Sequence, residues 1–414
     1  MRITAWGLNR STLGRQLLLG RASLPVAEAV RRVVALQAQH AASPYLALWN
    51  RLAAFDPADL DAAFAGRAVV KATLMRLTLH AVHAADYRAF REAMEPTLRA
   101  VMILRKGRFA VSGLTVAEAD ALVPELLAHA DQPRTAAEMK AWLAGRLGTP
   151  PDPSAWRGLR GYAPLLHAPT QASWSFAPRP SYVAAEPRPV LADPDASAAG
   201  LQTLITRYLE GFGPASVADV AQFALVQQAR AKEALTALSG VLERLDGPDG
   251  AVLYDILGAL RPTEDTPAPP RLLAMWDSIL LAYVDRSRVI PPDYRTLVIR
   301  SNGDVLPTLL VDGYVAGVWR PVEGGIEATA FHRLPDDAWE GLAAEAWSLV
   351  AFLADRDARV YSRYDHWWAT LPRPEARLLP GDWGGAPRTA SEAPRIGRSA
   401  RGHGWDGAGR PSIE

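Results

Sequence analysis

Residues 69–82 read VVKATLMRLTLHAV, a run of apolar and β-branched residues that predicts β-structure. Short helices are predicted before it. Pro25 is placed to start an amphipathic helix with apolar residues at 26, 29, 30 and 33, running through residue 36, and Asp56-Pro57 opens another over residues 58–65. Short helices followed by a β-ribbon are the element order of a winged-helix unit.

The same order recurs along the chain. A capping-box pattern, Thr115 to Glu118, opens a helical block over residues 115–146, and a Pro-rich, aromatic stretch of strands and loops follows over 163–189. Further on, Ser216 can cap a helix, and residues 241–246 and 251–255 form a plausible hairpin across Gly247–Gly250. Helices followed by a wing are therefore predicted again.

Beyond the proline-rich linker 261–270, the turn pairs Asn302-Gly303 and Asp312-Gly313 predict hairpins, with strands over 296–301, 304–311 and 314–319. Such turns favour a β-meander or small barrel. Pro335-Asp336 then opens a final amphipathic helix through Leu353, and the Gly, Pro, Arg and Ser composition near the C-terminus predicts a disordered tail.

The composition narrows the functional classes. The 414 residues include no cysteine, which excludes disulfides, thiolate metal sites and a cysteine nucleophile. No apolar run of membrane-spanning length and no signal-peptide pattern is present, so we expect a cytoplasmic protein that does not associate with a membrane. Residues 1–110 hold 16 Lys+Arg against 7 Asp+Glu, although the chain carries a net charge of +1. This asymmetry favours a nucleic-acid partner. Alternatively, the basic residues lie on solvated helix faces and bind nothing.

Two glutamines, Gln37 and Gln39, are the most informative polar residues. In a continuing helix, Gln37 would share the apolar face of Val33 and Val34, and Gln39 would point about 200° away from it. The helix must end or unwind here for both amides to address one point, and Ser43-Pro44 makes a nearby end plausible. Alternatively, Gln37 hydrogen-bonds to a neighbouring turn and Gln39 lies in solvent.

Other polar groups carry weaker signals. His80 and His83 lie three apart in a predicted strand, where they face opposite sides, so we expect no metal site. Arg286 and Arg288 can contact phosphate or pair with Asp285. Phosphate-binding loops and nucleophile elbows are absent from the sequence, and we expect no cofactor.

At this point the sequence resembles a known family, the winged-helix DNA glycosylases of the AlkZ and YcaQ superfamily that unhook interstrand crosslinks. The resemblance rests on four ordered segments: Val34–Tyr45, Lys71–Val82, Phe212–Phe223 and Leu272–Arg288. It implies an α+β fold of three tandem winged-helix units and a C-terminal β-barrel-like unit. With the boundaries above, these units fall at 1–110, 111–195, 196–268 and 269–372, with a disordered tail at 373–414.

The family divides at one motif, and Gln37-Ala38-Gln39 resembles the Gln-x-Gln, AlkZ-like branch. The resemblance implies hydrolysis of the N-glycosidic bond of bulky or crosslinked N7-alkylguanines in double-stranded DNA, for repair or self-resistance. Gln37 and Gln39 would position water and stabilise charge, while His80 and Arg76 line the site or contact phosphate. Ala38 between the glutamines and Leu77, where a Gly is common, are departures that bear on substrate range.

Two other functions remain open. A winged-helix transcriptional regulator would bind DNA without chemistry, although no dimerisation heptad is visible. A catalytically idle homologue would bind adducts and shield them. We see no obligate protein partner in the sequence. No lysine lies beside the glutamines in sequence, which favours a monofunctional hydrolase, although Lys71 could approach them in space.

Overall fold

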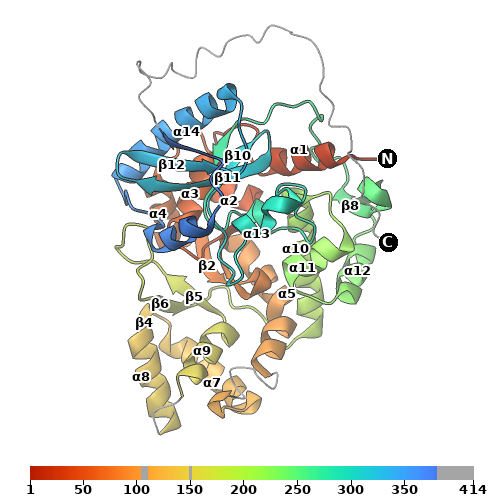
Figure 1. Ribbon diagram of the computed structural model, residues 1–414. Helices are drawn as coiled ribbons and strands as arrows, with labels where there is room; N and C mark the ends of the chain where they lie inside the picture. Colours follow the sequence, from red (N-terminus) through yellow and green to blue (C-terminus); the bar gives the residue numbers. More distant parts are fainter. Residues whose placement is uncertain (104–110, 149–151, 380–414) are drawn as a thin grey trace, which may run out of the picture. The chain divides into compact units, whose positions relative to one another are not determined.

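Helices alternate with short antiparallel strands in the computed structural model, which describes residues 1–103, 111–148 and 152–379 (Figure 1). The described helices are α1 (Ala5–Arg15), α2 (Val26–Arg32), α3 (Ser43–Arg51), α4 (Pro57–Ala65), α5 (Ala84–Ile103), α7 (Val116–His129), α8 (Ala136–Leu147), α9 (Pro153–Tyr162), α10 (Pro194–Phe212), α11 (Val217–Ala224), α12 (Gln228–Ala237), α13 (Arg295–Val298) and α14 (Asp336–Ala354). The mixed α+β class predicted from the sequence is confirmed. The winged-helix units and their boundaries stay predictions.

Local sequence signals explain many helix starts. Thr115 and Ser216 accept hydrogen bonds from the third residue of α7 and α11, and the acidic side chains at 118 and 219 bond back, as the sequence predicted for both caps. Asp56 caps α4, with Pro57 at its first position. These groups satisfy backbone N–H donors that a helix cannot pair internally.

A six-stranded sheet combines strands from residues 36–83 with strands from residues 134–184. Its order is β1-β3-β2-β5-β6-β4, from β1 (Leu36–Gln37), β2 (Val69–Thr73), β3 (Leu79–His83), β4 (Arg134–Thr135), β5 (Leu165–Ala168) and β6 (Ser181–Ala184). The run 69–82 is the predicted ribbon, with a 3₁₀ turn, η1 (Met75–Leu77), between its strands. The pair Lys71 and His167 connects β2 to β5, so both parts share one sheet.

The C-terminal part is a five-stranded antiparallel sheet covered by α14 (Figure 1). Its order is β13-β12-β11-β10-β9, from β9 (Arg271–Leu272), β10 (Thr308–Val311), β11 (Tyr314–Val322), β12 (Gly325–Ala330) and β13 (Glu375–Leu379). The predicted turn at Asp312-Gly313 joins β10 to β11. The predicted hairpin across 247–250 is present as β7 (Leu242–Asp246) and β8 (Val252–Ile256).

Three details of the sequence prediction were wrong. The helix beginning after Pro25 ends at Arg32 and does not reach residue 36, because Val34 adopts a left-handed φ of 74°. Residues 295–298 form the helical turn α13 in place of a strand, leaving a single bridge between Ile299 and Val305. Glu375–Leu379 is a strand paired with β12, so the disorder predicted from 373 does not hold there; the rest of that tail lies outside the described residues.

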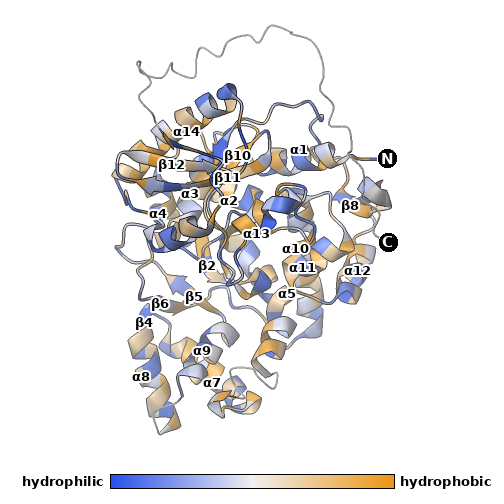
Figure 2. Cartoon of the chain, viewed as in Figure 1, coloured by the Kyte–Doolittle hydropathy of each residue, from blue (hydrophilic) through white to orange (hydrophobic). Residues whose placement is uncertain are grey.

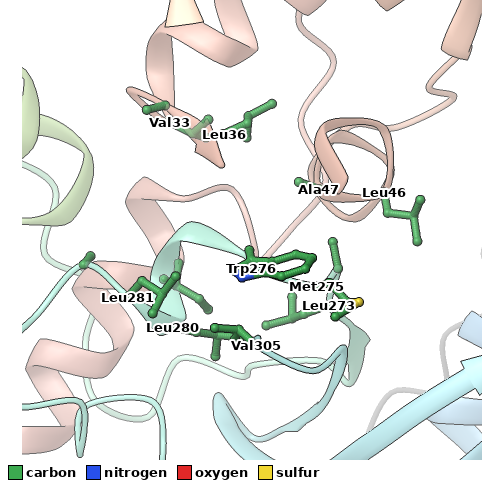
Figure 3. Close-up of a cluster of buried hydrophobic side chains, with 14 of the residues drawn as sticks. Val33, Leu36, Leu46, Ala47, Leu273, Met275, Trp276, Leu280, Leu281 and Val305 are labelled. Atoms are coloured by element: carbon green, nitrogen blue, oxygen red, sulfur yellow. The ribbon is translucent and has the colours of Figure 1, made fainter. Parts of the chain in front are cut away.

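The main hydrophobic core connects distant parts of the chain. Figure 3 shows one portion of it, and the labelled residues come from the end of α2 and β1, from α3, from the segment around residues 273–281 and from the segment before β10: Val33, Leu36, Leu46, Ala47, Leu273, Met275, Trp276, Leu280, Leu281 and Val305. Helices such as α10 and α14 carry both apolar and polar residues along their length (Figure 2), as amphipathic packing requires. Burial of this core couples the C-terminal part to the segment that bears the two glutamines.

Helices α5 and α10 pack closely (Figure 1). A Cβ added at Gly200 of α10 would lie 2.5 Å from the carbonyl oxygen of Ala89 in α5, so a larger residue there would force the helices apart. Among the described residues, no helix combines the length and apolar character needed to cross a membrane.

Candidate functional site

The end of α2 determines how Gln37 is presented. Val34, a β-branched residue in the left-handed region, turns the chain from the helix into β1. Gly211 of α10 lies against this turn, where an added Cβ would be 2.5 Å from Cγ2 of Val34. Close packing of α10 therefore supports the turn that places Gln37 on a strand.

The Gln37 side chain is held by Arg76. Gln37 is 5% exposed, and its Oε1 accepts a hydrogen bond of 2.7 Å from a terminal nitrogen of Arg76, in the turn between β2 and β3. A guanidinium group only donates, so the amide oxygen must face Arg76. The amide N–H groups of Gln37 are consequently left for other partners.

His80 completes this arrangement. It is the cross-strand partner of Gln37, and its Nδ1 lies 3.1 Å from the carbonyl oxygen of Thr78, which can only accept. Nδ1 therefore carries the proton, and Nε2 can accept from Arg76 at 3.4 Å. Burial, and then the charge of Arg76, lower the pKa of His80 to about 3. His80 is neutral at physiological pH and acts as an acceptor that orients Arg76.

Arg76 has no acidic partner within the described residues. Its second terminal nitrogen is buried without a hydrogen bond, and its guanidinium carbon lies 5.3 Å from the ring centroid of Phe223 in α11. Burial and the charge of Arg286 lower its pKa to about 10, so it stays cationic. Both arginines contribute positive potential beside Gln37, which suits an anionic polymer such as DNA.

Gln39 is bound differently. It is exposed, and its Oε1 accepts a hydrogen bond of 2.7 Å from the backbone N–H of Leu79, whose carbonyl accepts from Ala38. The side-chain oxygen of Gln39 thus takes the place of a backbone carbonyl as the acceptor for the Leu79 N–H of β3. Its amide group borders two cavities, of about 740 and 270 Å³.

Gln37, Arg76 and His80 therefore form one hydrogen-bonded cluster, and Gln39 is attached to Leu79, the residue beside His80. The N–H donors fix the carbonyl orientation of both amides. Among the described residues, no carboxylate bonds to any of these four predicted site residues. The two amides can hold water and turn a remaining carbonyl lone pair toward a developing positive charge, but the arrangement offers no strong general base.

The other two predicted residues differ in position. Arg286 lies near Arg76 and has a buried Nε without a hydrogen-bond partner. Arg288 is 9% exposed, donates to the carbonyls of Phe212 and Pro214 and stacks on Tyr283 at 4.0 Å. These contacts hold Arg288 inside the protein, so its geometry supports a structural role and lends no support to a DNA contact.

Sequence reasoning missed residues that come from β5 and α9. His167 pairs with Lys71 across the sheet, and Arg160 of α9 borders both cavities beside Gln39. No local motif marks these residues, because the sheet pairing that brings them together joins distant segments. The sequence drew attention to Lys71 only as a lysine that could approach the site in space.

The four segments that carry the family resemblance meet around Gln37. Ser278 donates from its hydroxyl to the carbonyl of Ala35 at 2.8 Å, and Asp277 forms a fully buried pair with Arg51 of α3, at 2.7 and 2.8 Å. Phe223 lies under Arg76. Within the part of the chain that the structure describes, no group of three His, Cys, Asp or Glu residues is placed to hold a metal ion.

Comparisons with known proteins show which family the chain is similar to. A family model described as DNA glycosylase AlkZ-like matches residues 30–352. An interstrand DNA cross-link repair glycosylase from Streptomyces sahachiroi is 25% identical over 366 residues, covering 83% of this chain and 94% of that protein. The solved structure of the DNA glycosylase AlkZ from the same organism has a similar fold, with a TM-score of 0.71, 21% identity, and coverage of 87% of this chain and 98% of that one. Because the model match spans well over half of the sequence, the chain belongs to the AlkZ-like DNA glycosylase family.

Proposed function

We propose that this protein is a monofunctional DNA glycosylase that hydrolyses the N-glycosidic bond of N7-alkylated guanines, bulky or crosslinked, in double-stranded DNA. Its family supports a DNA repair glycosylase, and the lesion is inferred from the chemistry of the site. The observation that carries the inference is the pair of neutral amides, Gln37 and Gln39, whose carbonyl oxygens are oriented by N–H donors.

The reaction needs little acid or base. An N7-alkylguanine is already cationic, so it leaves as a neutral base when the bond between C1′ and N9 breaks. The enzyme must hold a water molecule near C1′ and tolerate the oxocarbenium-like centre that develops there. Each glutamine retains one carbonyl lone pair, which can accept a hydrogen bond from water, and two N–H groups, which can donate to the water oxygen.

The same chemistry restricts the substrates. A neutral amide cannot remove a proton as a carboxylate can, so an unactivated, uncharged nucleoside should react poorly. Arg76 strengthens this restriction, because its hydrogen bond to Oε1 withdraws electron density from the Gln37 amide. The proposed function is repair, or self-resistance to alkylating agents, in the cytoplasm.

The test uses three duplexes that differ only at one position, which holds a bulky N7-alkylguanine, a uracil or an undamaged guanine. We expect alkali-sensitive sites to form only in the first duplex, and the untreated strand to stay intact because no lyase step follows. Excision of uracil at a comparable rate would contradict the proposed dependence on an activated leaving group. Absence of excision from bulky and small N7 adducts, with DNA binding intact, would favour a regulator or an adduct-binding protein.

A further inference from the structure

The cavity of about 740 Å³ beside Gln39 has a cationic lining. Lys71 of β2, Leu79 of β3 and His167 of β5 contribute from the six-stranded sheet. The loop containing Phe176 contributes from another side, as do Arg356, Asp357 and Arg363. Gln39 borders the same space, so a group bound there would be held next to a proposed catalytic amide.

Lys71 is a buried cation without an acceptor. It is 5% exposed, and its ammonium lies 4.3 Å from the ring centroid of Phe176. It makes no hydrogen bond or ion pair with any described residue. Burial lowers the pKa of Lys71 to about 8, so the amine is largely protonated at neutral pH. A buried ammonium without an anion is costly, and an anion that enters the cavity would relieve that cost.

The arginines around Lys71 differ in how they are neutralised. Arg356 lines this cavity and pairs at 2.7 Å with Asp61, which is not part of the lining. Arg160 and Arg363 are exposed, and neither forms an ion pair with a described carboxylate. Arg160 donates to the Tyr182 hydroxyl.

The remaining titratable lining groups neutralise this positive charge only in part. Asp357 is the one acidic residue in the described lining of the cavity, and it accepts from the Trp174 indole at 3.5 Å. Burial is the main cause that lowers the pKa of His40 to about 4 and that of His167 to about 3, so both are neutral. The cavity therefore holds an excess of positive charge when nothing is bound.

We propose that this cavity binds a phosphodiester of the lesion-bearing DNA strand, with Lys71 as the buried ligand and Arg160 and Arg363 at the exposed edge. The inference rests on the proposed function and names the part of the substrate that this cavity takes. Fixing one phosphate there would fix the adjoining sugar relative to Gln39. Lys71 is thus a positioning residue, and it takes no part in bond cleavage.

Lys71→Gln and Lys71→Arg test the assignment, with Lys232→Gln, an exposed lysine of α12, as the matched control. For Lys71→Gln we expect weaker binding to an N7-alkylguanine duplex, a half-saturating enzyme concentration raised by roughly tenfold, and a salt slope reduced by about 1. The limiting excision rate should change less. Lys71→Arg should restore affinity, and thermal melting reports whether each variant is folded.

The pH dependence separates a charged ligand from a structural lysine. The wild-type lysine is cationic below a pKa of about 8 and loses its charge above it, so wild-type affinity should fall between pH 7 and 9. Lys71→Arg remains charged and should hold its affinity at pH 9.

A neutral methylphosphonate, placed at successive linkages around the lesion, locates the phosphate. One position should weaken wild-type binding and have no further effect in Lys71→Gln. Equal losses in both proteins at every position would overturn the assignment, as would borohydride trapping of DNA on Lys71, which would identify it as a nucleophile. Inorganic phosphate at matched ionic strength should compete only weakly; strong competition would assign the cavity to free phosphate. Because affinity is measured apart from excision, binding without excision would contradict the proposed function and leave this site testable.

Discussion

Arg76 connects the residues around Gln37. One of its terminal nitrogens serves both the Gln37 oxygen and Nε2 of His80, and His80 is in turn anchored on the Thr78 carbonyl. The chain of donors and acceptors fixes the protonation of His80 and the orientation of the Gln37 amide. The site therefore depends on two neutral side chains, Gln37 and His80, held by the cationic Arg76.

The buried, neutral state of His80 predicts a loss of stability in acid. The unfolded chain gains a proton on this residue below about pH 6.5, and the folded chain only near pH 3. The free energy of unfolding should therefore fall as the pH drops through that window, by about 1.4 kcal/mol per pH unit from His80 alone.

Urea unfolding of wild type and His80→Asn between pH 7 and 5 measures this contribution. The variant should have a shallower pH dependence. His83→Asn should change it less, because His83 is half-buried although its pKa is lowered by the same cause. An unchanged slope in His80→Asn would show that His80 is not buried as a neutral group.

The backbone of Leu77 is strained, at the position where the family resemblance leads us to expect glycine. Its φ of 59° costs an L-residue roughly 1–2 kcal/mol, which glycine avoids. Leu77→Gly also loses about 1 kcal/mol of half-buried apolar surface, so we expect a net change in unfolding free energy within about 1 kcal/mol. Leu79→Gly, a half-buried control in β3, loses the burial without strain relief and should cost about 2 kcal/mol. Equal losses in the two variants would contradict this account.

Much of the residue-level site was predictable, but its geometry was not. Gln37, Gln39, His80 and Arg76 were identifiable from one motif, one β-ribbon and a resemblance. The bond from Arg76 to Gln37 was not, because it depends on consecutive left-handed residues, Arg76 and Leu77, with no glycine to announce them. Arg288 looked available in sequence because its carbonyl partners lie far away in the chain.

At the scale of elements, α3 and the segment after β9 hold β1 in place. Arg51 and Asp277 are both 0% exposed in their side chains, and Ser278 bonds to Ala35 just before β1. Turn and cap signals made many elements predictable. The end of α2 at Arg32 was not, since Val34 is a poor residue for the left-handed turn it makes, and the close packing of Gly211 against that turn joins distant segments.

The Arg51–Asp277 pair predicts a large stability loss on truncation. Asp277→Ala leaves an uncompensated buried guanidinium and should lower the free energy of unfolding by about 3–5 kcal/mol. Asp277→Asn retains an acceptor and should lose less. Glu186→Ala, which breaks an exposed pair with Arg188, should cost at most about 1 kcal/mol. Urea unfolding distinguishes these outcomes, and similar losses for Asp277→Ala and Glu186→Ala would refute the structural role of the buried pair.

At the scale of the whole molecule, segments far apart in sequence converge on β1 and β3. The positive balance of residues 1–110 gains meaning from this convergence, because Lys71 and Arg76 come from that region and lie at the site. Sequence patterns predicted the α+β class and the order of helices and hairpins. They did not predict the sheet shared between β2 and β5, which depends on a single pairing between distant strands.

Single-turnover excision of one N7-alkylguanine from a duplex tests most directly whether Gln37 and Gln39 carry the chemistry. Excision rate and duplex affinity are measured for wild type, Gln37→Ala and Gln39→Ala. Gln228→Ala, at an exposed glutamine that begins α12, is the matched control. We predict that each site variant loses about 10²–10³-fold in rate while its affinity stays near wild type, as expected when a preorganised polar group is removed. Full excision by either variant, or a loss of affinity equal to the loss of rate, would contradict the assignment of these two amides to the chemistry.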